Sequence, residues 1–124
     1  MNIDVIRFEK VKVTYNYPEQ KTIGKIIINN KSLGLSHMNP ATLYYNLSNN
    51  SEIRYQALIM ICNCGTIGCD DWIIEIEENE TEVIWMNFLY NWDDDDCDDP
   101  EVHESSILYR FDKNQYYNAL KELK

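Results

Sequence analysis

The residues with the clearest capacity for chemistry are three cysteines within eight positions, in the stretch Cys-Asn-Cys-Gly-Thr-Ile-Gly-Cys. Their thiolates could converge on a soft cation such as Zn²⁺, which favours tetrahedral sulfur and nitrogen ligands. The ligands of such a site would be Cys62, Cys64 and Cys69, with a fourth from Cys97, His103 or Asp70. Gly65 and Gly68 would allow the tight connection between two strands that brings the thiols together.

Two other interpretations of the cysteine cluster stay open. Zinc sites usually combine two separate C-x₂₋₄-C pairs, whereas this chain has one tight cluster, so the thiols could instead pack as small apolar side chains of a hairpin. A redox role requires a stabilised thiolate. The carboxylates of Asp70 and Asp71 follow the cluster directly and disfavour a thiolate, which argues against redox catalysis.

A dense acidic run is the second chemical feature. It carries eight of the 21 acidic residues, and without them 13 acids face 11 bases. Most of the net charge of −10 is therefore local. Such a concentration of negative charge attracts cationic partners and repels nucleic acid, so we expect no direct binding to DNA or RNA. The eight residues are Asp93, Asp94, Asp95, Asp96, Asp98, Asp99, Glu101 and Glu104.

Three roles for the acidic run can be compared. As a calcium loop it offers Asp93, Asp95 and Glu104 at positions 1, 3 and 12, but Asp98 stands where the loop needs glycine. As a solvated loop it needs no partner. As an interface it combines electrostatic steering with the neighbouring aromatic residues Tyr90 and Trp92, and this role is favoured because so dense a run repels itself.

No catalytic motif stands beside these features. The chain lacks a glycine-rich phosphate loop, a G-x-S-x-G elbow and an H-E-x-x-H pair. Its two histidines, His37 and His103, have no evident nucleophile partner, and His103 lies among carboxylates. We therefore expect a binding protein rather than an enzyme, with no cofactor unless zinc occupies the cysteine cluster.

Length and composition indicate one domain spanning residues 1–124. No apolar stretch approaches the roughly 18 residues of a membrane span, and the first residues lack the layout of a signal peptide. The expectation is a cytoplasmic protein, with no membrane partner and with reduced thiols.

The hydrophobic pattern predicts an α+β fold with a mostly antiparallel sheet. Strands are expected within residues 3–15 and over 23–28. A short helix is expected near 40–48, with Asn39 as N-cap and Pro40 at its first position. Residues 55–92 are expected to form an antiparallel meander, whose first strand is apolar enough to be central and covered on both faces.

Two further expectations concern the chain after the first meander strand. Trp72, Ile74 and Ile76 alternate with glutamates, which predicts a half-exposed strand. In the next strand, Ile84, Met86, Phe88, Tyr90 and Trp92 share a parity and are expected on one face. A loop is expected through the acidic run, then a short strand over 107–111.

A C-terminal helix is predicted over residues 112–123. Asp112 is the expected N-cap, and Gln115 three residues later would complete a capping box. Phe111 and Tyr116 occupy the positions of a hydrophobic staple.

Four stretches together resemble a group of small bacterial proteins. The resemblance covers roughly the last 100 residues, in order, and its most specific part is the C-x-C-G-x-x-G-C hairpin. Asn30 stands where that family prefers glycine, and the resemblance implies no catalytic residues. The matching stretches are Gly24–Asn30, Cys62–Cys69, Val83–Phe88 and the F-D-x-x-x-Y-x-x-A-L segment Phe111–Leu120.

In its small size and local acidity the chain is also similar to immunity proteins of bacterial toxin systems, including contact-dependent growth inhibition. Such proteins neutralise a cognate toxin, often a basic nuclease, by covering an essential surface. This similarity implies a protein that binds a basic toxin domain without catalysis. The expected contact residues are Tyr90, Trp92, Asp93, Asp94, Asp95, Asp96, Asp98, Asp99 and Glu101. The alternative is a small zinc-stabilised domain built on the cysteine cluster.

Overall fold

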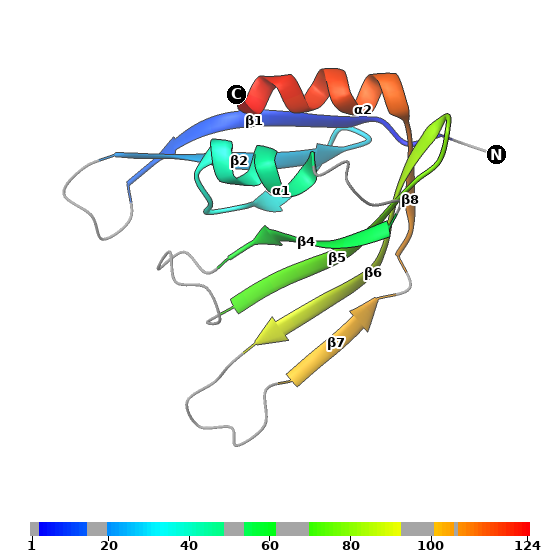
Figure 1. Cartoon of the computed structure of the whole chain (residues 1–124). Helices are drawn as coiled ribbons and strands as arrows, with labels where there is room; N and C mark the ends of the chain where they lie inside the picture. The colour runs from blue at the N-terminus through cyan, green and yellow to red at the C-terminus, as the bar shows by residue number, and fades with distance from the viewer. Residues whose placement is uncertain (1–2, 15–19, 49–53, 62–69, 93–100, 106) are drawn as a thin grey trace.

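A computed structural model describes residues 3–14, 20–48, 54–61, 70–92, 101–105 and 107–124. Eight strands and two α-helices account for most of this part of the chain (Figure 1). The elements are β1 (Ile6–Val13), β2 (Lys21–Ile28), β3 (Lys31–Leu35), α1 (Pro40–Leu47), β4 (Arg54–Met60), β5 (Asp70–Glu78), β6 (Glu82–Trp92), β7 (Glu101–Ser105), β8 (Tyr109–Asp112), α2 (Lys113–Leu120) and the 3₁₀-helix η1 (Lys121–Leu123).

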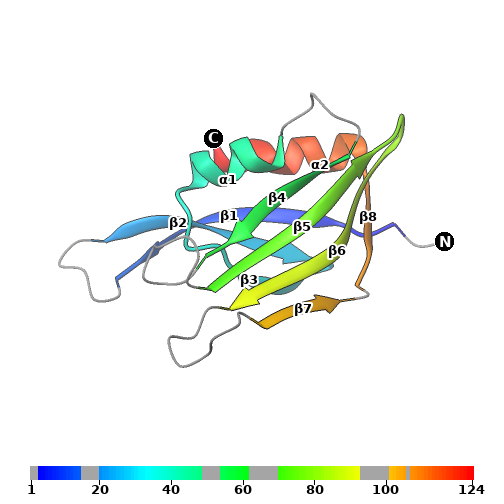
Figure 2. The ribbon, with the colours of Figure 1, turned by 60° about the horizontal axis from the view of Figure 1, so that its bottom comes forward.

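The strands form two antiparallel sheets, which confirms the predicted α+β class. Sheet B has the order β1-β2-β3, and sheet A has the order β4-β5-β6-β7, with β8 also paired to β6. The two sheets lie one in front of the other, and both helices run along one side of the pair (Figure 2). Within the described ranges, no helix is long and apolar enough to cross a bilayer.

Sheet B consists of two consecutive hairpins. The predicted strand at residues 23–28 forms the centre of the sheet as β2, with β1 on one side. After β2, Asn29 and Asn30 form a two-residue turn into β3, with φ of 55° and 64°. Positive φ at both turn positions is the geometry of a type I′ hairpin, which asparagine tolerates better than most residues.

Sheet A contains the predicted meander, in the order β4-β5-β6. The expectation that its first strand is central was wrong, because β4 is an edge strand and Gln56 on it is exposed. Helix α1 forms a hydrogen bond to the outer edge of β4, in which the Asn46 side chain donates to the carbonyl oxygen of Leu58 at 3.0 Å. The outer edge of β4 is therefore covered at this point, and its second face is not. This accounts for the apolar run in its sequence.

A bulge in β6 overturns the expected face of that strand. Asn87 has φ of 51°, and the register with β5 shifts by one residue between Ile73 and Glu75. The extra residue reverses the alternation, since each residue of a strand faces opposite to the next. Phe88 is buried, whereas Ile84 and Met86 lie partly exposed on the opposite face.

The acidic run was expected to be a loop throughout, and this was wrong for its last part. Residues 101–105 form β7, which pairs with the second half of β6, and β8 pairs with the first half. The predicted strand over 107–111 is observed as β8, which starts two residues later and ends one residue later. Residues 93–100 lie outside the described part of the chain.

Both helices begin where their capping residues predict. The Asn39 side chain accepts a hydrogen bond from the N–H of Ala41, and Pro40 is the first residue of α1. The Asp112 carboxylate accepts from the N–H of Gln115 at 3.0 Å, and Phe111 stacks on Tyr116. The capping box is incomplete, because the Gln115 side chain bonds to β1 instead.

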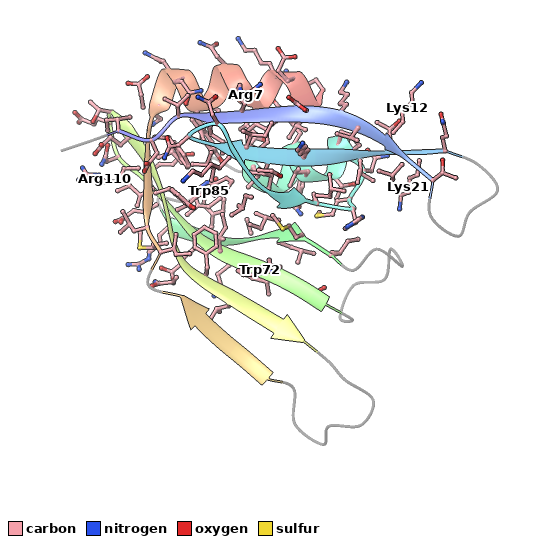
Figure 3. The ribbon with its side chains drawn as sticks, turned by 180° about the vertical axis from the view of Figure 1, so that it is seen from behind. Arg7, Lys12, Lys21, Trp72, Trp85 and Arg110 are labelled. Atoms are coloured by element: carbon pink, nitrogen blue, oxygen red, sulfur yellow. The ribbon has the colours of Figure 1, made fainter. Side chains whose placement is uncertain are left out.

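One apolar core joins the two sheets and the helices. Trp85 lies at its centre (Figure 3), with edge-on ring contacts to Phe111 and Tyr116. Trp85 and Tyr116 are fully buried. Aromatic pairs in this geometry stabilise the core beyond the area that they bury.

Candidate interaction face

The structure describes only part of the residues selected from the sequence. Cys62, Cys64, Cys69 and Cys97 and the run from Asp93 to Asp99 lie outside the described residues. Tyr90 and Trp92 belong to the end of β6, and Glu101 begins β7 opposite Trp92 in the register. His103 stands opposite Tyr90 in the same ladder. The ladder thus places Glu101, a member of the acidic run, opposite Trp92, which precedes that run in the sequence.

The described residues do not test the zinc or calcium interpretations. Among them, no group of three or more histidine, cysteine, aspartate or glutamate residues could hold a metal ion. Asp70, named as a fourth zinc ligand, is the first residue of β5 and stands opposite Trp92.

Sheet A has one face packed on the core and one face that no described helix or strand covers (Figure 2). We call the uncovered side the open face. The cross-strand register determines its members, because residues directly opposite each other point to the same side of a sheet. They include Arg54, Gln56, Leu58, Ile73, Glu75, Glu77, Glu82, Ile84, Met86, Asn87, Leu89 and Arg110.

Apolar side chains form a large part of the open face. Ile73 stands opposite Leu89, and Ile84 and Met86 lie nearer the start of β6. All four are partly exposed. A group of exposed apolar side chains rimmed by polar ones is the usual composition of a protein interaction surface.

Charged side chains interleave with this apolar group. Glu75 accepts hydrogen bonds from Arg54 and, at 3.2 Å, from the side-chain nitrogen of Asn87. Glu82 pairs with Arg110. Within the described part of the chain, Glu77 has no ion-pair partner, although it lies opposite Arg54 in the register. Glu77 is therefore the carboxylate of the open face that a cationic partner can engage without breaking an existing pair.

Further carboxylates lie at one end of sheet A, where β5 begins and β6 ends. Asp70 and Asp71 begin β5 at the end where β6 finishes, and Asp93 follows Trp92 directly in the sequence. In the ladder of β6 and β7, Glu104 stands opposite Leu89, and Glu101 opposite Trp92. The chain order therefore attaches the acidic run to the same end of sheet A as the apolar pair of Ile73 and Leu89.

Three tyrosines with a raised pKa lie away from the open face, and their hydroxyls form hydrogen bonds within the fold. Burial raises the pKa of Tyr116 well above its ordinary value, and that hydroxyl donates to the carbonyl oxygen of Leu47 at 3.1 Å. Burial also raises the pKa of Tyr55 and of Tyr117, whose hydroxyl bonds to Glu78. These hydroxyls stay protonated and contribute to packing, not to acid–base chemistry at neutral pH.

Two hollows lie beside the helices. One, of about 330 Å³, lies between α1 and β4 and is lined mainly by neutral side chains such as Thr42, Asn46 and Gln56. The other, of about 750 Å³, lies between β1 and α2. In the described part of the chain, neither combines a nucleophile with a base, so neither has the constellation of an active site.

Sequence reasoning noted the glutamates that alternate along β5 but missed the apolar part of the open face. Ile73 was missed because its neighbours Trp72, Ile74 and Ile76 form the apolar alternation of β5. The parity of Ile73 with Glu75 and Glu77 was the available signal, since all three stand on one face of β5. Comparison with protein-family models, with curated proteins and with solved structures finds no match to this chain.

Proposed function

We propose that this protein is a non-catalytic inhibitor of the immunity type, which binds and neutralises a basic toxin domain such as a nuclease. The open face would be the contact surface, and the acidic run would extend it. The observation that supports this most directly is that partly exposed aliphatic side chains share one uncovered sheet face with carboxylates.

The chemistry of this face favours a cationic protein as the partner. Burial of Ile73, Ile84, Met86 and Leu89 would supply the apolar contribution to affinity. Glu77 would meet a lysine or arginine of the partner, and the acidic run would accelerate association by long-range attraction. Nucleic acid does not suit this face, because its phosphates would be repelled.

A capture experiment with matched variants tests the proposal. The tagged protein is used to isolate a partner from its native cells at low salt, and the partner is then purified and its activity titrated against the wild-type protein. We expect a basic protein that binds with 1:1 stoichiometry and loses its activity on binding. A partner that is acidic, or that stays fully active in the complex, would contradict an inhibitory role.

Two charge-reversing variants then locate the interface. Glu77→Lys alters the open face, whereas Glu9→Lys makes the same charge change on β1, in the other sheet. We expect Glu77→Lys to weaken binding at least about tenfold and Glu9→Lys to leave it within about twofold. Equal effects of the two variants would show that the open face is not the contact surface.

Neutralising Asp93 to Asp96 tests the acidic run separately. We expect slower association and a weaker dependence on salt, with little change in dissociation. An unchanged association rate would show that the acidic run is not part of the interface. It would not contradict the role of the open face.

A further inference from the structure

No described strand pairs with the outer edge of β4, but the second half of this edge has other partners. The carbonyl oxygen of Leu58 accepts from the Asn46 side chain, and that of Ile59 accepts from the Ser36 hydroxyl at 2.6 Å. The N–H of Ile61 donates to the carbonyl oxygen of Ser36 at 2.9 Å. These bonds show which main-chain groups of β4 point away from β5.

The first half of the same edge carries main-chain groups that have no partner. Alternate residues of a strand direct these groups to the same edge, so those of Arg54 and Gln56 face outward like the carbonyl oxygen of Leu58. The bulge of β4 lies beyond Leu58 and leaves this alternation intact. Among the residues that the structure describes, none bonds to the outward N–H and carbonyl groups of Arg54 and Gln56. Both residues are exposed, so a neighbouring strand can reach these groups.

A hollow lies beside this free edge. Helix α1 runs next to β4 (Figure 1), and the hollow between them has a volume of about 330 Å³. Gln56, Ala57 and Leu58 line it from β4, and its lining from α1 includes Thr42 and Tyr45, whose ring is 73% exposed. All its lining residues are uncharged, so the hollow suits an uncharged side chain and would desolvate a charged one.

The free edge and the hollow together select an extended chain. The main-chain groups of an added strand would pair with those of Arg54 and Gln56, which requires no particular sequence. Successive side chains of that strand would point to opposite faces of the sheet. One set would enter the hollow on the α1 side, and the other set would lie next to Arg54 and Gln56 on the open face.

Charge and geometry decide which chain fits this edge. A second copy of the protein is disfavoured, because each copy has a net charge of −10 and the two would repel each other. In an antiparallel pair of β4 strands centred on Gln56, Leu58 of one copy would also stand opposite Arg54 of the other. Its carbonyl oxygen is already bonded to Asn46. A segment of a different protein without excess negative charge meets neither obstacle.

We propose that the free edge of β4 binds an extended segment of a partner protein, which adds to sheet A as a further strand and places an uncharged apolar side chain in the hollow beside Tyr45. The site adjoins the open face, because Arg54 and Gln56 belong to both. It goes beyond the proposed function, since it requires neither a toxin nor inhibition and applies to any partner with such a segment.

Peptide selection against the full chain tests the proposal. A random decapeptide library displayed on phage is selected on the immobilised protein, and the affinities of enriched peptides are measured by fluorescence anisotropy. We expect aliphatic or aromatic residues at alternate positions, without enrichment of aspartate or glutamate. N-methylation of one alternating set of residues should weaken binding at least about tenfold, and of the other set less than about threefold, because only one set directs its N–H groups to β4.

Two pairs of variants locate the site. Gln56→Pro removes the outward N–H without removing a ladder bond to β5, and Gln56→Val keeps that N–H as the control. Thr42→Trp fills the hollow from α1, whereas Ala41→Trp makes the same kind of change at an exposed neighbour that does not line it. We expect Gln56→Pro and Thr42→Trp to lower peptide affinity at least about tenfold, and both controls to change it less than about threefold. Thr42→Trp leaves the β4 main chain intact, so it tests the site even if Gln56→Pro does not fold.

Three results would overturn the proposal. The first is that selection yields no peptide whose affinity falls with Thr42→Trp. The second is an equal effect of N-methylation on the two alternating sets, which would mean that the main chain of β4 is not paired. The third is a dimer of the protein alone, seen by analytical ultracentrifugation and abolished by Gln56→Pro, which would assign the edge to a second copy. None of these measurements uses a captured toxin, so their outcome is independent of the proposed inhibitory function.

Discussion

The side chain of Gln115 on α2 is bonded at both ends of its amide to the main chain of Ile6 on β1, 109 residues earlier in the sequence. The contact ties the C-terminal helix to the edge of sheet B. It also covers one main-chain position of an edge strand, which would otherwise be free to pair with another chain.

Replacing Gln115 by glutamate should destabilise the fold. Glutamate keeps the acceptor for the N–H of Ile6 but loses the donor, and its charge faces the carbonyl oxygen of Ile6. We expect the free energy of unfolding to fall by about 1–3 kcal/mol at neutral pH, measured by urea denaturation. Asn118→Asp, on the same helix and exposed, is the control with the same change of charge, and an equal loss there would rule out the Ile6 contact as the cause.

Loss of the small buried hydroxyl of Tyr116 should lower the stability of the fold substantially. The hydroxyl accepts from the indole N–H of Trp85 at 3.4 Å and donates to the carbonyl oxygen of Leu47 at 3.1 Å. Tyr116→Phe leaves the Trp85 donor buried without its partner, so we expect a loss of about 1–3 kcal/mol in the free energy of unfolding. Tyr45→Phe removes a hydroxyl from an exposed ring and should change stability by less than about 0.5 kcal/mol.

High pH should unfold the protein through its buried tyrosines. Burial raises the pKa of Tyr55, Tyr116 and Tyr117 above the ordinary value of 10.0. Above pH 10 the unfolded chain loses these protons while the folded chain keeps them, so stability present below pH 10 is lost as pH rises. Each such tyrosine contributes a slope of up to about 1.4 kcal/mol per pH unit. In urea titrations between pH 9 and 11, Tyr116→Phe should show a shallower decline than the wild type, and an identical decline would contradict the assignment.

Mild acid should weaken the fold through His37. Partial burial, and secondarily the positive charge of Lys21, lower the pKa of His37 below 6.5. As pH falls below 6.5, the unfolded chain binds the proton before the folded chain does, so stability present above pH 6.5 is progressively lost. His37 has φ of 59°, which asparagine tolerates, so His37→Asn should keep the backbone and flatten the dependence of unfolding free energy on pH between 6.5 and 5. Parallel curves for the two proteins would assign the acid effect to other groups.

Local signals predicted the elements whose ends are determined by neighbouring residues. Asn39 with Pro40, and Asp112, mark the two helix starts correctly, because capping acts within three residues of the cap. The two apolar strands of sheet B were visible for a similar reason. The sequence did not reveal contacts between residues far apart in the chain. Gln115 bonds to Ile6 instead of completing the local capping box, and β4 is an edge strand.

The sequence predicted that the candidate site is acidic, but it did not predict which apolar side chains share its face. Acidic residues are evident in any sequence, so the acidic run could be identified at once. The apolar part of the open face depends on the bulge at Asn87, where positive φ reverses the alternation of β6. A single asparagine does not identify such a bulge, since asparagine also adopts positive φ in ordinary turns. The face of Ile84 and Met86 could therefore be assigned only once the register with β5 was known.

The two asparagines of the β2–β3 turn should respond in opposite directions to the same substitution. Both have positive φ, at 55° for Asn29 and 64° for Asn30. Asn29 also accepts from the N–H of Val5 and donates to the carboxylate of Asp4, each at 2.9 Å, whereas no described residue is bonded to the Asn30 side chain. Asn-Gly is the preferred pair in a type I′ turn, because glycine adopts positive φ without a steric penalty.

We therefore expect Asn30→Gly to raise the free energy of unfolding by about 0.5–1 kcal/mol, since it relieves the backbone and removes no contact. Asn29→Gly relieves the backbone equally but removes both side-chain hydrogen bonds to the β1 end of the chain, so it should lower stability by about 1–2 kcal/mol. Urea denaturation of the two variants side by side compares these effects. Stabilisation by both variants would mean that the contacts of Asn29 with Val5 and Asp4 contribute little, and that the turn geometry alone governs this hairpin.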